Sequence, residues 1–209
     1  MSEETTLWQH NGCVLSRREI KAAIQRNEIR FDPEPEPQQF AEASVNLRLR
    51  YKFTKLKEGV EHKIILGKKG FRSLAESKLW IERTYQHVDS FGKRESHCLE
   101  PKEFILGQTL ERIWIPRNLI ARVEGRSGYA RVGLTVHQTA PWLQPGWDGQ
   151  ITLEFFNCGP FRLDLTPIDD VPCQVTFFRL SSELSEEEAY GSKTTDSFRH
   201  QSSPLPSAK

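Results

Sequence analysis

The feature that most constrains the fold is a succession of short β-like segments between Pro101 and Leu180. They are rich in β-branched and aromatic residues and are separated by Gly, Pro and Asn. The segments cover residues 103–107, 109–115, 119–125, 132–138, 149–156, 161–165 and 174–180. Many short strands with turns at intervals of about 8–12 residues predict an all-β domain of sandwich or barrel type.

The N-terminal part predicts one helix, over residues 16–31. Ser16 and Glu19 have the spacing of a capping box, and the apolar residues that follow recur at helical intervals. Residues 32–38 carry three prolines, which favour an extended connector. Residues 44–49 alternate apolar and polar side chains and predict a strand.

Two regions depart from this pattern. Residues 55–100 are basic and punctuated by glycines, and we interpret them as a variable insertion in a core of residues 1–180. Residues 181–209 are rich in serine and poor in large apolar groups. That composition is typical of a disordered tail, and the alternative is a lid that orders over a ligand.

Charge and hydropathy exclude several classes of protein. Lys and Arg total 29 against 28 for Asp and Glu, a balance unlike that of a nucleic-acid-coating protein. Mean hydropathy is −0.58, and no apolar run approaches the ~20 residues of a membrane span. The first ten residues are acidic and polar, unlike a signal peptide. We therefore expect a soluble cytoplasmic protein that binds neither nucleic acid nor membrane.

The four cysteines do not predict a metal site or a disulfide framework. They are Cys13, Cys98, Cys158 and Cys173, and no two form a C-x-x-C pair. A structural zinc site therefore lacks its usual spacing, and four reduced thiols are expected.

An anion site is one interpretation of the turn Gly125–Gly128, which reads G-R-S-G. Glycine lets backbone amides approach a ligand closely, while Arg126 and Ser127 add hydrogen-bond donors. Arg131 follows within reach of the same turn. An ordinary surface turn with this composition is the alternative.

Glu154 is the candidate for acid–base chemistry. Strand alternation places Ile151, Leu153 and Phe155 on one face and Glu154 on the other. Glu154 is then either a solvated carboxylate or, if partly buried by nearby aromatic residues, a group suited to proton transfer. His137 lies in a strand pattern and is expected to be structural.

Several catalytic motifs are missing. The chain has neither the H-x-E nor the P-C-x-x-C of zinc nucleobase deaminases. It also lacks a Walker A loop, a G-x-G-x-x-G and a G-x-S-x-G.

Together, these residues resemble the dCTP deaminase branch of the dUTPase-like superfamily. The resemblance is strongest over residues 101–180 and extends to the segments 15–33, 44–49 and 189–207. It implies a mainly β fold, a distorted β-sandwich or jelly roll with an N-terminal helix. It also implies a homotrimer with active sites between subunits.

The resemblance implies deamination of dCTP to dUTP and ammonia without zinc. Glu154 matches the residue that shuttles protons between water, the cytosine ring and ammonia. Ser127 and Arg131 match the residues that orient the water and stabilise charge at C4. One carboxylate can serve in both directions, and fixed donors can replace the polarising effect of a metal.

The resemblance also implies a nucleotide-binding set, with Mg²⁺ accompanying the triphosphate. Backbone groups of Val136–Ala140 match those that read the pyrimidine edge, and Arg126 to Gly128 match the phosphate-binding turn. The full set is Arg126, Gly128, Val136, Thr139, Ala140, Gln144, Trp147, Tyr190 and Gln201.

Four positions differ from the family pattern. Gly128 replaces a serine, Gln144 an aspartate at the sugar, Asn46 a first-motif aspartate, and Ser197 a lid lysine. Two kinds of alternative therefore remain beside a dCTP deaminase. One is a diphosphatase that cleaves dUTP to dUMP, or a bifunctional enzyme that does both; the other is a non-catalytic or regulatory nucleotide-binding homologue.

Overall fold

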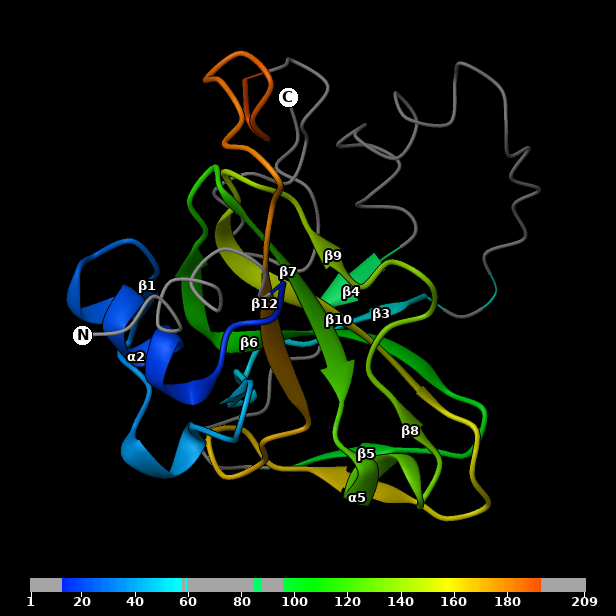
Figure 1. Cartoon of the computed structure of the whole chain (residues 1–209). Coiled ribbons are helices and arrows are strands. Elements are labelled where there is room, and N and C mark those ends of the chain that lie inside the picture. The colour runs from blue at the N-terminus through cyan, green and yellow to red at the C-terminus, as the bar shows by residue number, and fades with distance from the viewer. Residues whose placement is uncertain (1–12, 58, 60–84, 88–95, 193–209) are drawn as a thin grey trace, which may run out of the picture.

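The strand-rich region forms antiparallel sheets in the computed structural model, which describes residues 13–57, 59, 85–87 and 96–192 (Figure 1). The helical elements are α2 (Arg17–Gln25), α5 (Ser127–Ala130) and the 3₁₀ turn η1 (Pro37–Gln39). The strands are β1 (Arg30–Asp32), β2 (Val45–Leu47), β3 (Thr54–Leu56), β4 (Tyr85–His87), β5 (His97–Leu99), β6 (Phe104–Trp114), β7 (Leu119–Gly125), β8 (Leu134–Thr135), β9 (Trp142–Leu143), β10 (Asp148–Asn157), β11 (Leu163–Leu165) and β12 (Cys173–Arg179).

Two sheets carry most of the fold. The larger has the order β4-β3-β6-β10-β8, with β1 also paired to β6, and the smaller has the order β2-β12-β7-β9. In Figure 1, β7 and β12 of the smaller sheet lie in front of β6 and β10 of the larger one. Strands β5 and β11 form a separate pair.

A single hydrophobic cluster joins the two larger sheets. Its members include Val123 and Phe177 from the smaller sheet and Ile105, Leu153 and Phe155 from the larger. All five are at most 3% exposed. Burial of each large apolar side chain contributes about 1.5–3 kcal/mol, so this cluster is the main stabilising contact between the layers. The prediction of a mainly β fold is confirmed.

The alternation predicted for β10 is also confirmed. Ile151, Leu153 and Phe155 are buried on the core face, and the half-buried Glu154 lies on the other. One boundary prediction was wrong: residues 103–107 and 109–115 are not two strands but the single strand β6. The strand continues through Gln108 because that residue pairs with Thr152 in the ladder with β10.

The predicted helix over residues 16–31 is too long. Ser16 caps α2, where its backbone N–H donates to Glu19 Oε2 at 2.9 Å, but the helix ends at Gln25. Asn27 then has a φ of 58°, a left-handed conformation that ends a helix and that Asn tolerates. The chain after this turn forms β1, which buries Phe31 against the core.

Parts of the less regular regions are described. Within the predicted insertion, β3, β4 and β5 are strands, and Leu99 is fully buried. Residues 181–192 are described, and Ala189 is buried there. Residues 58, 60–84 and 88–95 of the insertion and residues 193–209, with Ser197 and Gln201, lie outside the described residues.

The four cysteines are free thiols, as expected. Cys173 is buried, and burial raises the pKa of its thiol well above the ordinary value. Among the described residues, no helix has the length and apolar character needed to cross a bilayer.

Candidate functional site

Glu154 is held against the segment that follows β8. Its Oε2 accepts a hydrogen bond from the backbone N–H of Gln138 at 2.9 Å. Its own backbone N–H donates to the carbonyl of Val136, also at 2.9 Å. The Gln138 side-chain amide closes the arrangement by donating to the Glu154 carbonyl at 3.2 Å. The carboxylate is therefore oriented by the segment predicted to read a pyrimidine.

This segment leaves the sheet earlier than predicted. A strand was expected over residues 132–138, but β8 contains only Leu134 and Thr135. Val136 is buried, whereas Thr139 and Ala140 are exposed before the chain enters β9. The backbone of residues 136–140 is thus irregular, which frees its amides for contacts other than a ladder.

The predicted anion turn forms the single helical turn α5. Arg126 precedes it, with its backbone N–H bonded to the Pro172 carbonyl at 3.0 Å and its guanidinium donating to the Val171 carbonyl at 3.1 Å. The Tyr129 hydroxyl donates to Asp170 Oδ1 at 2.8 Å. These contacts fix α5 to the loop before β12.

The predicted ligand-binding side chains of α5 face solvent. Ser127, Gly128 and Arg131 are exposed. A Cβ at Gly128 would meet no atom within 4 Å, so no steric need for glycine explains its place in the turn. Among the described residues, the Arg131 guanidinium has no ion-pair or side-chain hydrogen-bond partner.

A third group of predicted residues gathers at the turn before β10. The Trp147 ring stacks on Tyr190, with ring centroids 5.5 Å apart and planes inclined by 29°. The Tyr190 backbone N–H donates to the Pro145 carbonyl at 2.8 Å. Gly146, with a φ of 88°, lies so close that a Cβ would be 3.0 Å from the Tyr190 carbonyl oxygen. The start of the predicted tail is therefore packed on the turn that carries the exposed Gln144.

One chain does not bring all the predicted residues together. In the part of the chain that the structure describes, no hydrogen bond joins Glu154 to Ser127 or Arg131. Figure 1 shows α5 at one end of the molecule and residues 181–192 at the other. Glu154 thus contacts the segment predicted to read the pyrimidine. The turn 125–128 and the Trp147–Tyr190 contact lie at opposite ends of the molecule.

Sequence reasoning missed a hydrogen-bonded cluster of polar side chains next to this site. His137 Nε2 lies 3.3 Å from Glu124 Oε2, and Arg122 Nε donates to Glu124 Oε1 at 2.6 Å. Partial burial raises the pKa of Glu124, but the hydrogen bonds from His137 and Arg122 outweigh it and hold that pKa below its usual value. Glu124 and His137 are 13 residues apart in the sequence, and no local pattern indicates their contact.

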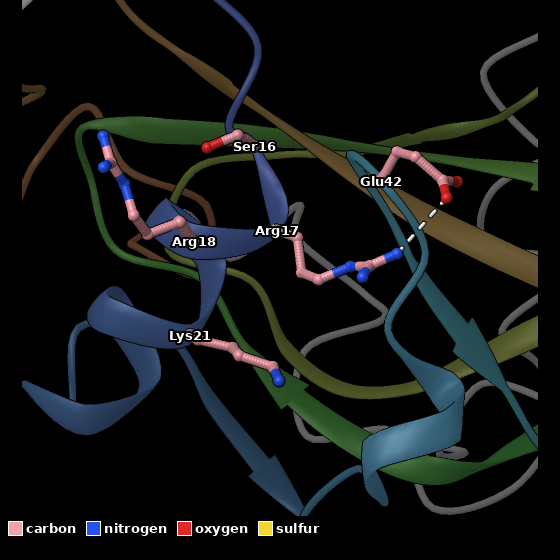
Figure 2. A pocket seen from close by; sticks show the side chains of 5 residues that line it. All are labelled: Ser16, Arg17, Arg18, Lys21 and Glu42. Carbon is pink, nitrogen blue, oxygen red and sulfur yellow. Dashed lines mark hydrogen bonds and ion pairs between the residues drawn. The ribbon is translucent and has the colours of Figure 1, made fainter.

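Three surface hollows lie elsewhere, around α2. The largest of the three, about 570 Å³, is lined by Ser16, Arg17, Arg18, Lys21 and Glu42. Figure 2 shows Arg17 reaching Glu42, with 3.2 Å between Nη2 and Oε1, while Arg18 points away. None of these three hollows is lined by a predicted site residue.

Comparisons with known proteins give a consistent result. A family model described as dCTP deaminase-like matches residues 14–180. The dCTP deaminase of Rhodospirillum rubrum is 37% identical over 194 residues, which cover 92% of this chain and 95% of that protein. A dCTP deaminase, dUMP-forming, from Dictyoglomus thermophilum is 32% identical over 201 residues, which cover 93% of each chain.

A solved structure shares the fold. It is that of 2'-deoxycytidine 5'-triphosphate deaminase from Agrobacterium tumefaciens, with a TM-score of 0.60 at 17% identity. The match covers 85% of this chain and 51% of that one, so this chain spans about half the length of the solved chain.

Proposed function

Because this chain belongs to the dCTP deaminase-like family, we propose that it hydrolyses the C4 amino group of dCTP. The products are dUTP and ammonia. The observation that carries the proposal is the half-buried Glu154. Its carboxylate is oriented by a hydrogen bond of 2.9 Å from the backbone N–H of Gln138. A carboxylate held in this way can move protons without rearranging during the reaction.

Glu154 is the proposed proton shuttle. It takes a proton from water as the water oxygen attacks C4, and a tetrahedral centre forms. It passes that proton to the ring nitrogen, then takes the remaining proton from the C4 hydroxyl and delivers it to the amino group. The C4–N bond breaks as ammonia departs, and the C4 oxygen becomes the carbonyl of the product. Proton transfer by a positioned group of this kind contributes about 10²–10⁴-fold to a rate.

Ser127 and Arg131 are proposed to orient the water and stabilise charge at C4. Both are exposed, and the Arg131 guanidinium is unpaired within the described residues. A free guanidinium and a hydroxyl are suitable donors to developing negative charge. No step of this proposal is assigned to zinc, because the chain lacks the zinc-deaminase motifs.

The proposed substrate is dCTP with Mg²⁺ on its phosphate oxygens. Arg126, Ser127 and Gly128 would contact the triphosphate, and backbone groups of residues 136–140 would contact the pyrimidine edge. Gln144 and Trp147 would lie at the sugar. Tyr190 and Gln201 would close the site from the C-terminal segment.

We further propose a homotrimer with the sites between subunits. Its support is that α5 carries exposed, unpaired donors that do not bond to Glu154 in the described part of one chain. A neighbouring copy that places its α5 against Glu154 would complete the constellation. Since its substrate is a cytoplasmic nucleotide, the proposed location is the cytoplasm.

A bifunctional enzyme is the second candidate, because the Dictyoglomus relative is named dUMP-forming. Such an enzyme would release pyrophosphate as well as ammonia. The exposed Gln144, where the family pattern has an aspartate, bears on this choice. A non-catalytic homologue would release neither product.

The test is a panel of dCTP, CTP, dCMP and dUTP with Mg²⁺, assayed for ammonia, phosphate and pyrophosphate. Ammonia from dCTP with intact dUTP as co-product is expected, and 1,10-phenanthroline should leave the rate unchanged. Pyrophosphate formed with the ammonia would assign the bifunctional activity. No turnover of any nucleotide would contradict the proposal, and a nucleotide-dependent rise in Tm would then favour a regulatory binder.

A further inference from the structure

Two polar side chains next to Glu154, on the same face of the sheet, have no hydrogen-bond partner among the described residues. Gln108 on β6 lies directly opposite Thr152 on β10 in the antiparallel ladder. Gln108 is fully buried. Its Nε2 and Oε1 and the Thr152 Oγ1 are buried atoms that form no hydrogen bond within the described part of the chain. Three unsatisfied polar atoms therefore meet at one cross-strand position.

Neighbouring polar groups in the same ladder are satisfied. The Thr109 hydroxyl donates to the Glu111 carbonyl at 2.8 Å and accepts from the Ile151 backbone N–H at 3.0 Å. The Gln150 amide donates to the Leu110 carbonyl at 3.1 Å. Because buried polar groups in folded proteins nearly always have a partner, the Gln108–Thr152 pair indicates a small polar ligand at this point.

The pair lies on the same face as the proposed proton shuttle. Thr152 and Glu154 are two residues apart on β10, so their Cα atoms are separated by about 6.6 Å along the strand. The residue opposite Glu154 on β6 is the apolar Leu106. On the other side of β10, the uncharged Gln138 contacts Glu154, and His137 contacts Glu124 instead. Thr135 on β8 also lies on this face, opposite Phe156, but its hydroxyl is already bonded to the Phe156 carbonyl. Within the β6–β10 ladder, the polar side chains next to Glu154 on this face are those of Gln108 and Thr152.

We propose that Gln108 and Thr152 hold ordered water that hydrogen-bonds to the carboxylate of Glu154. The water accepts from the Gln108 amide and the Thr152 hydroxyl and donates to Glu154. It spans a distance that neither side chain covers directly, since each of its hydrogen bonds adds about 2.8 Å. Gln108 and Thr152 are then positioning residues for the deamination, an inference that rests on the proposed function.

This water would complete the hydrogen bonding of the carboxylate. One carboxylate oxygen of Glu154 already accepts a hydrogen bond from the backbone N–H of Gln138. The water is a second donor, from the side of Gln108 and Thr152. It fixes the rotation of the Glu154 carboxylate and favours the ionised form. The ionised form is the one that accepts a proton from the attacking water.

The kinetic test compares Thr152→Val, Gln108→Leu and the double variant with wild type. Loss of the water should lower kcat about tenfold, a part of the contribution of proton transfer, while KM for dCTP stays within about twofold. The acid limb of the pH–rate profile should move to higher pH, because the carboxylate form has lost a donor. The double variant should match the single ones, since all three remove the same water.

Thr109→Val is the matched control. It removes a neighbouring hydroxyl that already has two protein partners. It should lower Tm and leave the pH–rate profile in place. If Thr152→Val instead raises Tm and leaves kcat unchanged, the site is dry and the proposal is overturned.

A high-resolution crystal structure of the wild-type protein provides a readout independent of activity. Density for a water within about 3 Å of Gln108 and Thr152 is expected. A site without such density would overturn the inference even in an active enzyme. If the protein releases no ammonia from dCTP, the proposed function fails. A water found at Gln108 and Thr152 would then still confirm the water site, but that site would have no role in catalysis.

Discussion

The buried polar groups at the two ends of the β6–β10 ladder differ in how completely they are hydrogen-bonded. At one end, Glu111 is fully buried and bonded on both carboxylate oxygens. At the other, Glu154 is half-buried and lies beside the unpartnered pair Gln108 and Thr152. Buried polar groups in one sheet can therefore serve two purposes. The satisfied end joins elements of the fold, and the unsatisfied end is available to a ligand.

The Glu111 end joins three distant parts of the chain. Its Oε1 lies 2.7 Å from Arg48 Nε and 2.9 Å from Gln39 Nε2, and its Oε2 accepts from the Arg48 backbone N–H at 2.9 Å. These contacts link η1 and the residues after β2 to β6. The charge of Glu111 is therefore compensated inside the protein.

Removing the Glu111 charge should have the largest effect on stability. Glu111→Gln leaves Arg48, only 15% exposed, without its buried carboxylate. We expect the free energy of unfolding to fall by about 3 kcal/mol, the lower end for a broken buried pair, because Glu36 still contacts Arg48 at 2.8 Å. Urea unfolding measures this.

The matched control is Glu42→Gln at the exposed pair with Arg17 (Figure 2). Its side chains are 93% and 48% exposed, so the loss should stay below about 1 kcal/mol. Equal losses in the two variants would remove the distinction between the Glu111 end and the surface.

Thr109→Val should have an intermediate effect. The substitution leaves the Ile151 N–H, which now donates to the Thr109 hydroxyl at 3.0 Å, without an acceptor in the core. The expected loss in the free energy of unfolding is about 1–3 kcal/mol. An unchanged free energy of unfolding would contradict the role of the Thr109 hydroxyl as the acceptor for the Ile151 N–H.

His97 tests whether an unpartnered atom alone marks a ligand site, and its effect should be the smallest. Its Nε2 is buried without a hydrogen-bond partner among the described residues, and its ring stacks on Phe53 with 5.1 Å between ring centroids. Burial holds the pKa of His97 below its ordinary value of 6.5, against the opposing charge of Glu103. The unfolded chain therefore binds the proton more readily. The stabilising effect is complete above pH 6.5 and is lost as pH falls from there through the folded-state pKa.

The measurement is Tm at pH 7.5, 6.5 and 5.5 for wild type and His97→Phe. The Tm of wild type should fall more between pH 6.5 and pH 5.5 than the Tm of the variant. The rate of deamination by the variant should be unchanged. Identical pH dependence in the two proteins would refute the role of His97.

Local patterns in the sequence predicted much of the fold. Alternation from Ile151 to Phe155 set the faces of β10, and Ser16 with Glu19 set the start of α2. The end of α2 was missed because it depends on the left-handed turn at Asn27 and on the pairing of β1 with β6. Such long-range pairing leaves no local periodic signal.

The candidate site was predicted less completely. The turn 125–128 and Glu154 were found from residue types and from the family resemblance. The Glu124–His137 contact and the Gln108–Thr152 pair were not. The first depends on the path of the irregular segment after β8, and the second on the register of β6 with β10. Gln108 in particular lies at a point where the sequence predicted a break between strands.

Ammonia release from dCTP by wild type and by Glu154→Gln tests the central claim most directly. The amide keeps the shape of the side chain but cannot accept the proton from water. Release should fall by about 10²–10⁴-fold, with Tm and the Tm shift caused by dCTP retained. Ammonia release by Glu154→Gln within tenfold of wild type would contradict the assignment of Glu154 as the proton shuttle.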